Sequence, residues 1–231
     1  AVQTYKGNID VASLDIQDAT TSVTLGADTS KTVKTATSVD INSDSGELTQ
    51  NAKVDAGTSL DYDTAGAIGI NESIATGSTI DIDAGNTTTI AEAGDIDAGG
   101  AVTFGADKAG TLTTAANITT TDDDVTFTNA VTLSGGDAKV LIDTTGTELG
   151  DILFKSDVRT GGQAFTLDAG ESGDITADAS ITGGGAFTVV DGAVQTYKGN
   201  IDVASLDIQD ATTSVTLGAD TSKTVKTATS V

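Results

Sequence analysis

The feature that most constrains the fold is an internal repeat. Residues 1–39 and 193–231 share one sequence, AVQTYKGNIDVASLDIQDATTSVTLGADTSKTVKTATSV, without a single difference. The offset from Ala1 to Ala193 is 192 residues, so 1–192 is one full tandem unit and 193–231 begins an identical one. Repetition at a fixed period decides the architecture, because each unit must stack on the next. We therefore expect a segment of a longer array; a duplicated terminal segment is the alternative.

Short runs that alternate apolar and polar residues recur along the chain, and clusters of Gly, Asn, Asp, Ser and Thr separate them. Such alternation is typical of strands with one buried face, and such clusters are typical of turns. No segment shows sustained helical periodicity. The runs are LDIQ at 14, VDIN at 39, LDYD at 60, IDID at 80, VTFG at 102, VTFT at 125, FTLD at 165, FTVV at 187 and LDIQ again at 206.

The spacing of these runs predicts the coil. Their starts follow one another at similar intervals, except between 125 and 165, where the interval is nearly doubled and we place a missing start near Val140. This gives about nine coils of about 21 residues in each 192-residue unit. One coil cannot bury its own apolar side chains, but stacked coils share a continuous core. We therefore predict an all-β fold, a parallel β-solenoid or β-helix, in which 193–231 continues the solenoid of 1–192.

Composition restricts the function classes. The chain has no His, Cys, Met, Trp or Pro, and its formal net charge is −23. Without His and Cys it lacks the commonest general base and the best nucleophile, so we expect no enzyme. The negative charge repels nucleic acid and anionic membranes, and no apolar stretch approaches the ~20 residues that a membrane helix needs. High charge with few aromatic residues is also typical of disorder, but a hydrophobic content of 37% in short β-type runs favours a folded chain.

Two segments carry a family resemblance. DDDVTFTNAVTLSGGDAKVLIDTTGTELGDILFKSDV at 122–158 and FTLDAGESGDITADASITGGGAFTVV at 165–190 resemble the repeats of giant bacterial surface and secreted β-strand-repeat proteins, the filamentous-haemagglutinin-like adhesins. The resemblance implies a secreted right-handed parallel β-helix with a role in surface attachment or a biofilm matrix. It carries over no functional residues, because none of the family's secretion or receptor motifs occurs here.

Acidic residues are the candidate site. In-register strands place Asp15, Asp40, Asp61 and Asp81 in one outward column, followed by Thr103 and Thr126, and begin a second column with Gln17, Asn42, Asp63 and Asp83. Carboxylates at the ~4.8 Å strand spacing repel by about 1 kcal/mol each in water, and Ca²⁺ between them would relieve this repulsion. The candidate metal ligands are Asp40, Asp61, Asp63, Asp81, Asp83, Asp122, Asp123 and Asp124.

The alternative is that these acids are solvated face and turn residues, screened by salt. The Gly-Gly-x-Gly-x-Asp calcium repeat does not occur. Two other hypotheses have less support. A polysaccharide hydrolase needs paired carboxyls at a set distance, and an ice-binding face needs Thr-x-Thr in nearly every coil. We expect no catalytic residues and no resident cofactor, with Ca²⁺ the one candidate ion.

The function that follows is structural. We expect a component of an extracellular fibre or cell-surface filament of tandem β-solenoid repeats, which divalent cations can bridge. The alternative is an adhesin stalk whose binding tip lies outside residues 1–231. The expected partners are further copies of the chain, through end-to-end or lateral fibre contacts, with divalent cations or cell-surface glycans as candidates. We expect no nucleic-acid partner, no membrane insertion, and an extracellular or cell-surface location.

Overall fold

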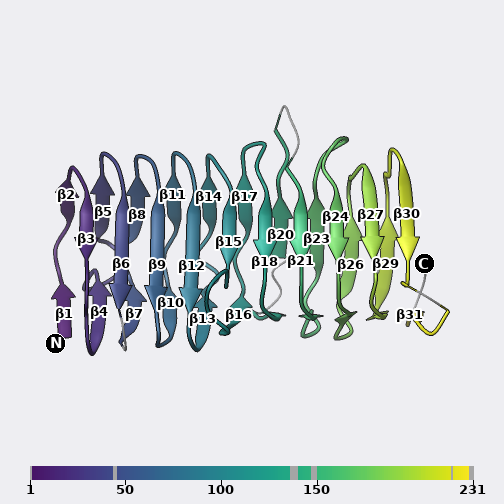
Figure 1. The fold of residues 1–231 in the computed structure, drawn as a ribbon, viewed down its shortest axis with the longest axis horizontal. Coiled ribbons are helices and arrows are strands. Elements are labelled where there is room, and N and C mark those ends of the chain that lie inside the picture. Colours follow the sequence, from purple (N-terminus) through teal and green to yellow (C-terminus); the bar gives the residue numbers. More distant parts are fainter. Residues whose placement is uncertain (1, 44–45, 136–139, 147–149, 220, 229–231) are drawn as a thin grey trace.

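The structure is a computed structural model that describes residues 2–43, 46–135, 140–146, 150–219 and 221–228. These residues form 31 strands and no helix, so they include no helix that could span a membrane. The strands stack in chain order along one axis, from β1 at one end to β30 and β31 at the other (Figure 1). Every third strand belongs to the same sheet, which gives the stack three faces.

Sheet A has 11 strands and holds the two outermost strands of the chain order. Its strands are β1 (Val2–Tyr5), β4 (Ser22–Leu25), β7 (Glu47–Gln50), β10 (Ile68–Ile70), β13 (Thr87–Ile90), β16 (Thr111–Thr114), β19 (Val131–Leu133), β22 (Val158–Arg159), β25 (Ile181–Thr182), β28 (Ile201–Val203) and β31 (Val225–Thr227).

Sheets B and C have 10 strands each. Sheet B contains β2 (Ile9–Val11), β5 (Thr32–Thr35), β8 (Lys53–Ala56), β11 (Ile74–Thr76), β14 (Ile96–Ala98), β17 (Ile118–Thr120), β20 (Val140–Asp143), β23 (Phe165–Asp168), β26 (Ala186–Val189) and β29 (Ser205–Ile208). Sheet C contains β3 (Leu14–Ile16), β6 (Val39–Ser43), β9 (Leu60–Thr64), β12 (Ile80–Ala84), β15 (Val102–Phe104), β18 (Val125–Phe127), β21 (Ile152–Phe154), β24 (Ile175–Ala177), β27 (Val194–Tyr197) and β30 (Ser214–Leu217).

Neighbouring strands in each sheet are parallel and lie one coil apart. The length of a coil varies along sheet C: it is short where Ile80 follows Leu60 and longest where Ile152 follows Val125. The chain therefore winds as a β-solenoid of about ten turns, and the predicted fold class is confirmed.

The core lies between the three sheets, because alternate side chains of each strand point inward. On sheet C the inward column includes Phe104, Phe127 and Phe154, which lie directly opposite one another. The first two rings are stacked with centroids 5.3 Å apart, and the second pair is 4.6 Å apart. Tyr62 lies in the same column with no exposed surface, as its inward position in LDYD predicts. One apolar cluster runs through the stack, which is how repeated coils share a core.

Glycines let the turns between sheets B and C stack at backbone contact. A Cβ added to Gly77 would lie 2.3 Å from the carbonyl oxygen of Gly57, and one added to Gly99 would lie 2.5 Å from that of Gly77. No side chain fits in this space, so the corner requires glycine in successive coils.

The runs used to count coils change face between Val125 and Phe165, so the predicted start near Val140 is in register with Phe165 but not with Val125. Val140 lies on sheet B, the face of Phe165 and Phe187, whereas the strand that follows Val125 on sheet C begins at Ile152. Inward and outward residues alternate in the same way on all three sheets, so the alternation alone does not identify the face. The unit also falls one strand short of nine turns. The second copy begins with β27, 26 strands after β1, which is eight and two-thirds turns.

Candidate functional site

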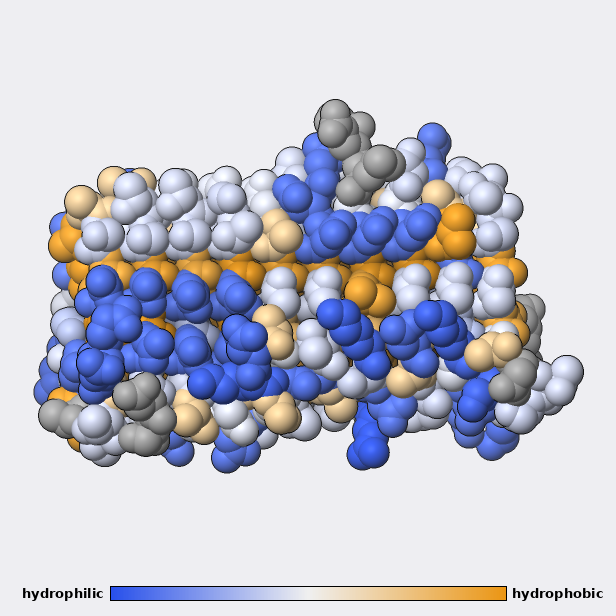
Figure 2. Space-filling view, viewed as in Figure 1, coloured by the Kyte–Doolittle hydropathy of each residue, from blue (hydrophilic) through white to orange (hydrophobic). Residues whose placement is uncertain are grey.

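The acidic ladder consists of Asp15, Asp40, Asp61 and Asp81, one from each of the first four strands of sheet C. The pairing places each carboxylate directly opposite the next. Figure 2 shows hydrophilic residues gathered over this part of the stack, in rows along its axis. Beyond Asp81 the column continues with Thr103, Thr126, Leu153, Thr176, Thr196 and Thr216. The predicted register of the acids and of the first two threonines is confirmed.

The second outward column also forms, with Asn42, Asp63 and Asp83 opposite one another. The segment after β15, residues 105–110, closes over the end of this column. Asp107 donates its backbone N–H to both carboxylate oxygens of Asp83, at 3.4 and 3.3 Å. Lys108 Nζ lies 2.9 Å from Asp63 Oδ1. Asp83 is consequently only 5% exposed.

Sequence reasoning missed Lys108 as a partner of Asp63. The two residues lie two coils apart, on β9 and in the segment after β15, so no local pattern connects them. The signal that could have found it is the length of the connection between 104 and 111, which exceeds a tight turn and carries the only cation of that segment.

Burial and repulsion from neighbouring carboxylates raise the pKa values of two ladder acids, Asp61 and Asp81. Burial, followed by the charges of Asp83 and Asp61, raises the pKa of Asp81 to about 6. Burial and then the charge of Asp40 raise the pKa of Asp61. Asp81 Oδ1 is buried and accepts no hydrogen bond from the described residues. Asp61 and Asp81 therefore repel each other within the acidic ladder.

The ladder does not form an enclosed metal site. Within the described ranges, no three acidic side chains come together in a group that could hold a metal ion. The carboxylates stand in two columns along the axis, with Asp40, Asp61 and Asp81 in one and Asp63 and Asp83 in the other, whereas Ca²⁺ takes six to eight oxygens around a point. The metal assignment of Asp40, Asp61, Asp63, Asp81 and Asp83 stays a prediction, in the weaker form of loosely held counter-ions.

The acids at 122–124 belong to a turn before β18. Asp122 has a positive φ of 65°, and the backbone carbonyl of Asp123 accepts a hydrogen bond from the Thr120 hydroxyl. Asp124 Oδ1 accepts a hydrogen bond from the backbone N–H of Asp151, one coil on, at 2.9 Å. For Asp124 this is a structural role that does not require a metal.

The same contact repeats in the next two coils. Asp151 Oδ1 accepts from the Asp174 N–H at 2.8 Å, and Asp174 Oδ1 accepts from the Val194 N–H at 3.0 Å. The three carboxylates line a groove of about 160 Å³, which is below the 300–1,000 Å³ of typical ligand pockets. Burial raises the pKa of Asp151, and the charges of Asp124 and Asp174 add to this effect.

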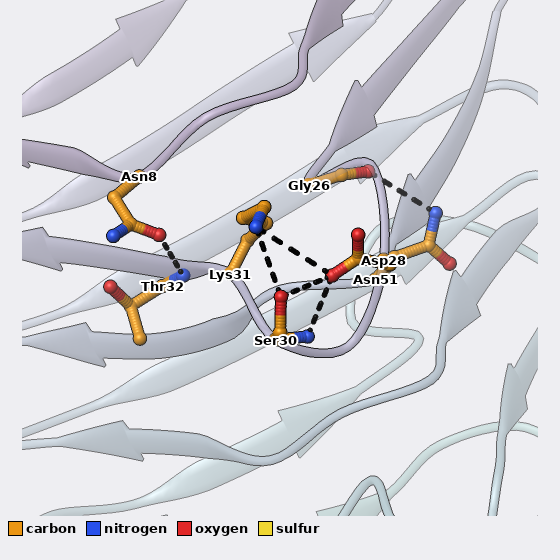
Figure 3. Close-up of polar contacts among 7 residues, drawn as sticks. All are labelled: Asn8, Gly26, Asp28, Ser30, Lys31, Thr32 and Asn51. Carbon is orange, nitrogen blue, oxygen red and sulfur yellow. Dashed lines mark hydrogen bonds and ion pairs between the residues drawn. The ribbon is translucent and has the colours of Figure 1, made fainter.

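Asn and Asp play this part at other corners too. Asn117 Oδ1 accepts from the Leu141 N–H at 3.0 Å, and Asn8 Oδ1 accepts from the Thr32 N–H at 3.2 Å (Figure 3). Figure 3 also shows Asp28, which accepts hydrogen bonds from the backbone and hydroxyl of Ser30; these bonds lower its pKa. The sequence signal was an Asp or Asn directly before the first apolar residue of a strand. Part of the acidic composition is therefore explained by Asp side chains that accept backbone hydrogen bonds from the next coil.

The threonine column lies on sheet A. Its outward positions run in register through Thr4, Thr24, Thr49, Gly69, Thr89, Thr113, Thr132, Arg159 and Thr182. The neighbouring outward positions hold Val2, Ser22 and Glu47 in the first coils, so a double Thr-x-Thr row is confined to β13 and β16 among the described strands of this sheet.

No protein-family model, curated protein or solved structure matches this chain. The likeness to filamentous-haemagglutinin-like adhesins therefore rests on the short motifs at 122–158 and 165–190.

Proposed function

We propose that this chain is a structural component of an extracellular fibre or cell-surface filament made of tandem β-solenoid repeats. One observation supports the proposal most strongly: the coil stacking passes from the first unit into the second without a break. On sheet C, Ile175 lies opposite Gln195 and Ala177 lies opposite Tyr197. Sheets A and B cross the same boundary through β25–β28 and β26–β29.

The junction between the two units has packed aromatic rings and an ion pair. The Phe187 and Tyr197 rings meet edge to face with centroids 5.8 Å apart. Lys198 Nζ lies 2.7 Å from Asp178 Oδ1 on the exposed side. A unit therefore ends in a surface that fits the start of an identical unit, which is the property that a linear array requires.

The mechanism that follows is mechanical. Nearest-neighbour coil contacts add along the axis, so stability grows with the number of coils. Eight and two-thirds turns at ~4.8 Å make each unit a rod segment of ~42 Å. The net charge of −23 keeps rods soluble and apart, and counter-ions at the acidic ladder reduce the repulsion within and between them.

Length measurement tests the rod proposal. Chains that carry one, two and three complete units are compared by electron microscopy. We expect the length to grow by ~42 Å per added unit at constant width. Separate globules on a string would overturn the proposal. Attachment of these chains to cells or to glycan surfaces would favour an adhesin over a passive filament.

Thermal melting tests the counter-ion part. We expect Ca²⁺ to raise the melting temperature more than NaCl at equal ionic strength, and the double variant D61N/D81N to lose that extra gain. The variant D10N, on sheet B outside the acidic ladder, is the control and should keep it. If the two salts raise the melting temperature of the parent chain equally, Ca²⁺ has no specific effect at the acidic ladder and acts only by general screening.

A further inference from the structure

The two copies of the repeated sequence lie on different faces of the solenoid. Strand β1 is on sheet A, but its equivalent β27 is on sheet C. Likewise β2 is on sheet B and β28 on sheet A, and β3 is on sheet C and β29 on sheet B. Every equivalent strand has moved by one face in the same direction.

The local path of the chain is nevertheless the same in both copies. Val2 pairs with Ser22 in the first copy, and the equivalent Val194 pairs with Ser214 in the second. The hydrogen bond from the Thr32 N–H to Asn8 Oδ1 has its counterpart in Thr224 and Asn200, at 3.0 Å.

The inward side chains agree as well. Tyr5 donates its hydroxyl to Gln3 Oε1 at 2.9 Å, and Tyr197 donates to Gln195 Oε1 at 3.3 Å. The second copy is therefore the first one turned about the axis, not a refolded version of it.

The cause is the number of strands in a unit. Each turn uses three strands, and the equivalents β1 and β27 are 26 strands apart. Because 26 is not a multiple of three, continuous pairing brings the second copy to a new face. No face can be skipped without leaving a gap in a sheet, where unpaired strand edges are costly.

We infer that consecutive units of the array are each turned by two-thirds of a revolution, so that the surface pattern repeats only after three units. Three units contain 78 strands, which complete 26 turns and span ~125 Å at the strand spacing. This inference rests on the proposed function only in assuming that units follow one another in a fibre.

The rotation determines on which face of the fibre each unit carries its acidic ladder. The acidic ladder starts with Asp15 on sheet C in the first unit, and its equivalent Asp207 lies on sheet B. Successive units therefore present the ladder on three different faces in turn. A neighbouring fibre of the same chain therefore meets an acidic ladder on whichever of the three faces it approaches.

The rotation also joins threonine surfaces of different units. Thr4 and Thr24 start the threonine column on sheet A, but their equivalents Thr196 and Thr216 lie on sheet C. There they continue directly from Thr176 of the first unit. The threonine column of one unit thus continues the outward column on sheet C of the preceding unit, which runs from Thr103 to Thr176.

Paired cysteines in this cysteine-free chain test the rotation. Thr176 and Thr196 are direct partners on sheet C, at a spacing of ~4.8 Å that falls in the range of disulfides. If the copies shared a face, Thr196 would instead follow Thr182 on sheet A. We expect oxidised T176C/T196C to protect most of both thiols from alkylation, and T182C/T196C to protect no more than the single-cysteine controls.

Pyrene labels on the same pairs give a second readout that does not depend on disulfide geometry. Excimer emission is expected from 176/196 and not from 182/196, and the reverse outcome would overturn the rotation. Both measurements use the single chain, so they do not depend on whether it forms fibres. For the array, electron tomography of a three-unit chain with gold on D81C in each unit should show three labels at three azimuths. Labels along one line would contradict the inference.

Discussion

Residues 1–39 and 193–231 have one sequence but occupy two environments. Leu25 is fully buried between coils, whereas its equivalent Leu217, on the last described strand of sheet C, is 41% exposed. The difference reverses at the start of each copy. Val11 is 41% exposed, but its equivalent Val203 is 2% exposed, because its strand β28 stacks on β25 of the first unit. The pairing register within the two copies is the same.

The comparison separates three levels of control. Local sequence determines the path of a coil and which side chains point inward. The neighbouring coil determines whether those side chains are buried. The number of preceding strands determines which of the three sheets a strand joins. The repeated sequence itself does not influence this choice. Matched substitutions in the two copies can therefore break or sharpen this account.

The largest expected effect comes from a charge in the core. Val23 has no exposed surface, and its equivalent Val215 is 41% exposed. Val23→Asp buries an unpaired carboxylate and should cost more than about 4 kcal/mol, whereas Val215→Asp should cost less than about 1 kcal/mol. Urea unfolding followed by circular dichroism measures both. Equal losses would mean that burial does not differ between the copies.

The reverse asymmetry is expected at the tyrosines. Tyr197 is 1% exposed at the unit junction, so Tyr197→Ala should cost about 3–5 kcal/mol through lost burial and a cavity. Tyr5 is only partly buried at the open end, and Tyr5→Ala should cost about half as much or less. The free energies of unfolding of the two variants provide the test; a larger loss at Tyr5 would contradict the junction packing.

The turn contacts should behave alike in both copies. Asn8 and Asn200 each accept the backbone N–H of the next coil, at 3.2 and 3.0 Å. Replacing either with Ala should cost about 1 kcal/mol and speed hydrogen exchange at the Thr32 or the Thr224 amide. Unchanged exchange at these amides would show that the side chains do not hold the coils together.

The smallest effect concerns pH and the acidic ladder. Asp81 has a folded-state pKa raised from 3.8 to about 6, so the folded chain binds more protons than the unfolded chain in that window. Stability therefore falls as pH rises from about 4 to about 6. Asp81→Asn should stabilise the protein above pH 6 by up to about 1 kcal/mol, and this gain should vanish below about pH 4.

The control for this prediction is Asp207→Asn. Asp207 is the equivalent of Asp15, but it lies opposite Thr188 instead of another acid. We expect thermal melts between pH 4 and 8 to show no comparable gain for this variant. A pH-independent effect of Asp81→Asn would exclude charge repulsion as its cause.

The sequence predicted those parts of the fold that depend on alternation within a coil. The in-register column of Asp15, Asp40, Asp61 and Asp81 follows from the position of each acid in its run. The coil start at Ile152 could not be predicted, because the three sheets share one alternation and the interval from Val125 to Ile152 is the longest between partners on sheet C. The contact of Lys108 with Asp63 depends on how a surface segment folds back over two coils, which no periodicity encodes.

Nuclear Overhauser contacts in the isotopically labelled chain test the central claim most directly, namely that the alternating segments stack as parallel coils of one rod. The account predicts contacts between Val102 and Val125 and between Val125 and Ile152, one coil apart, and contacts of Tyr197 with Ala177 across the unit boundary. Contacts between strands adjacent in sequence, such as Val102–Phe104 with Thr111–Thr114, in an antiparallel pattern would contradict it.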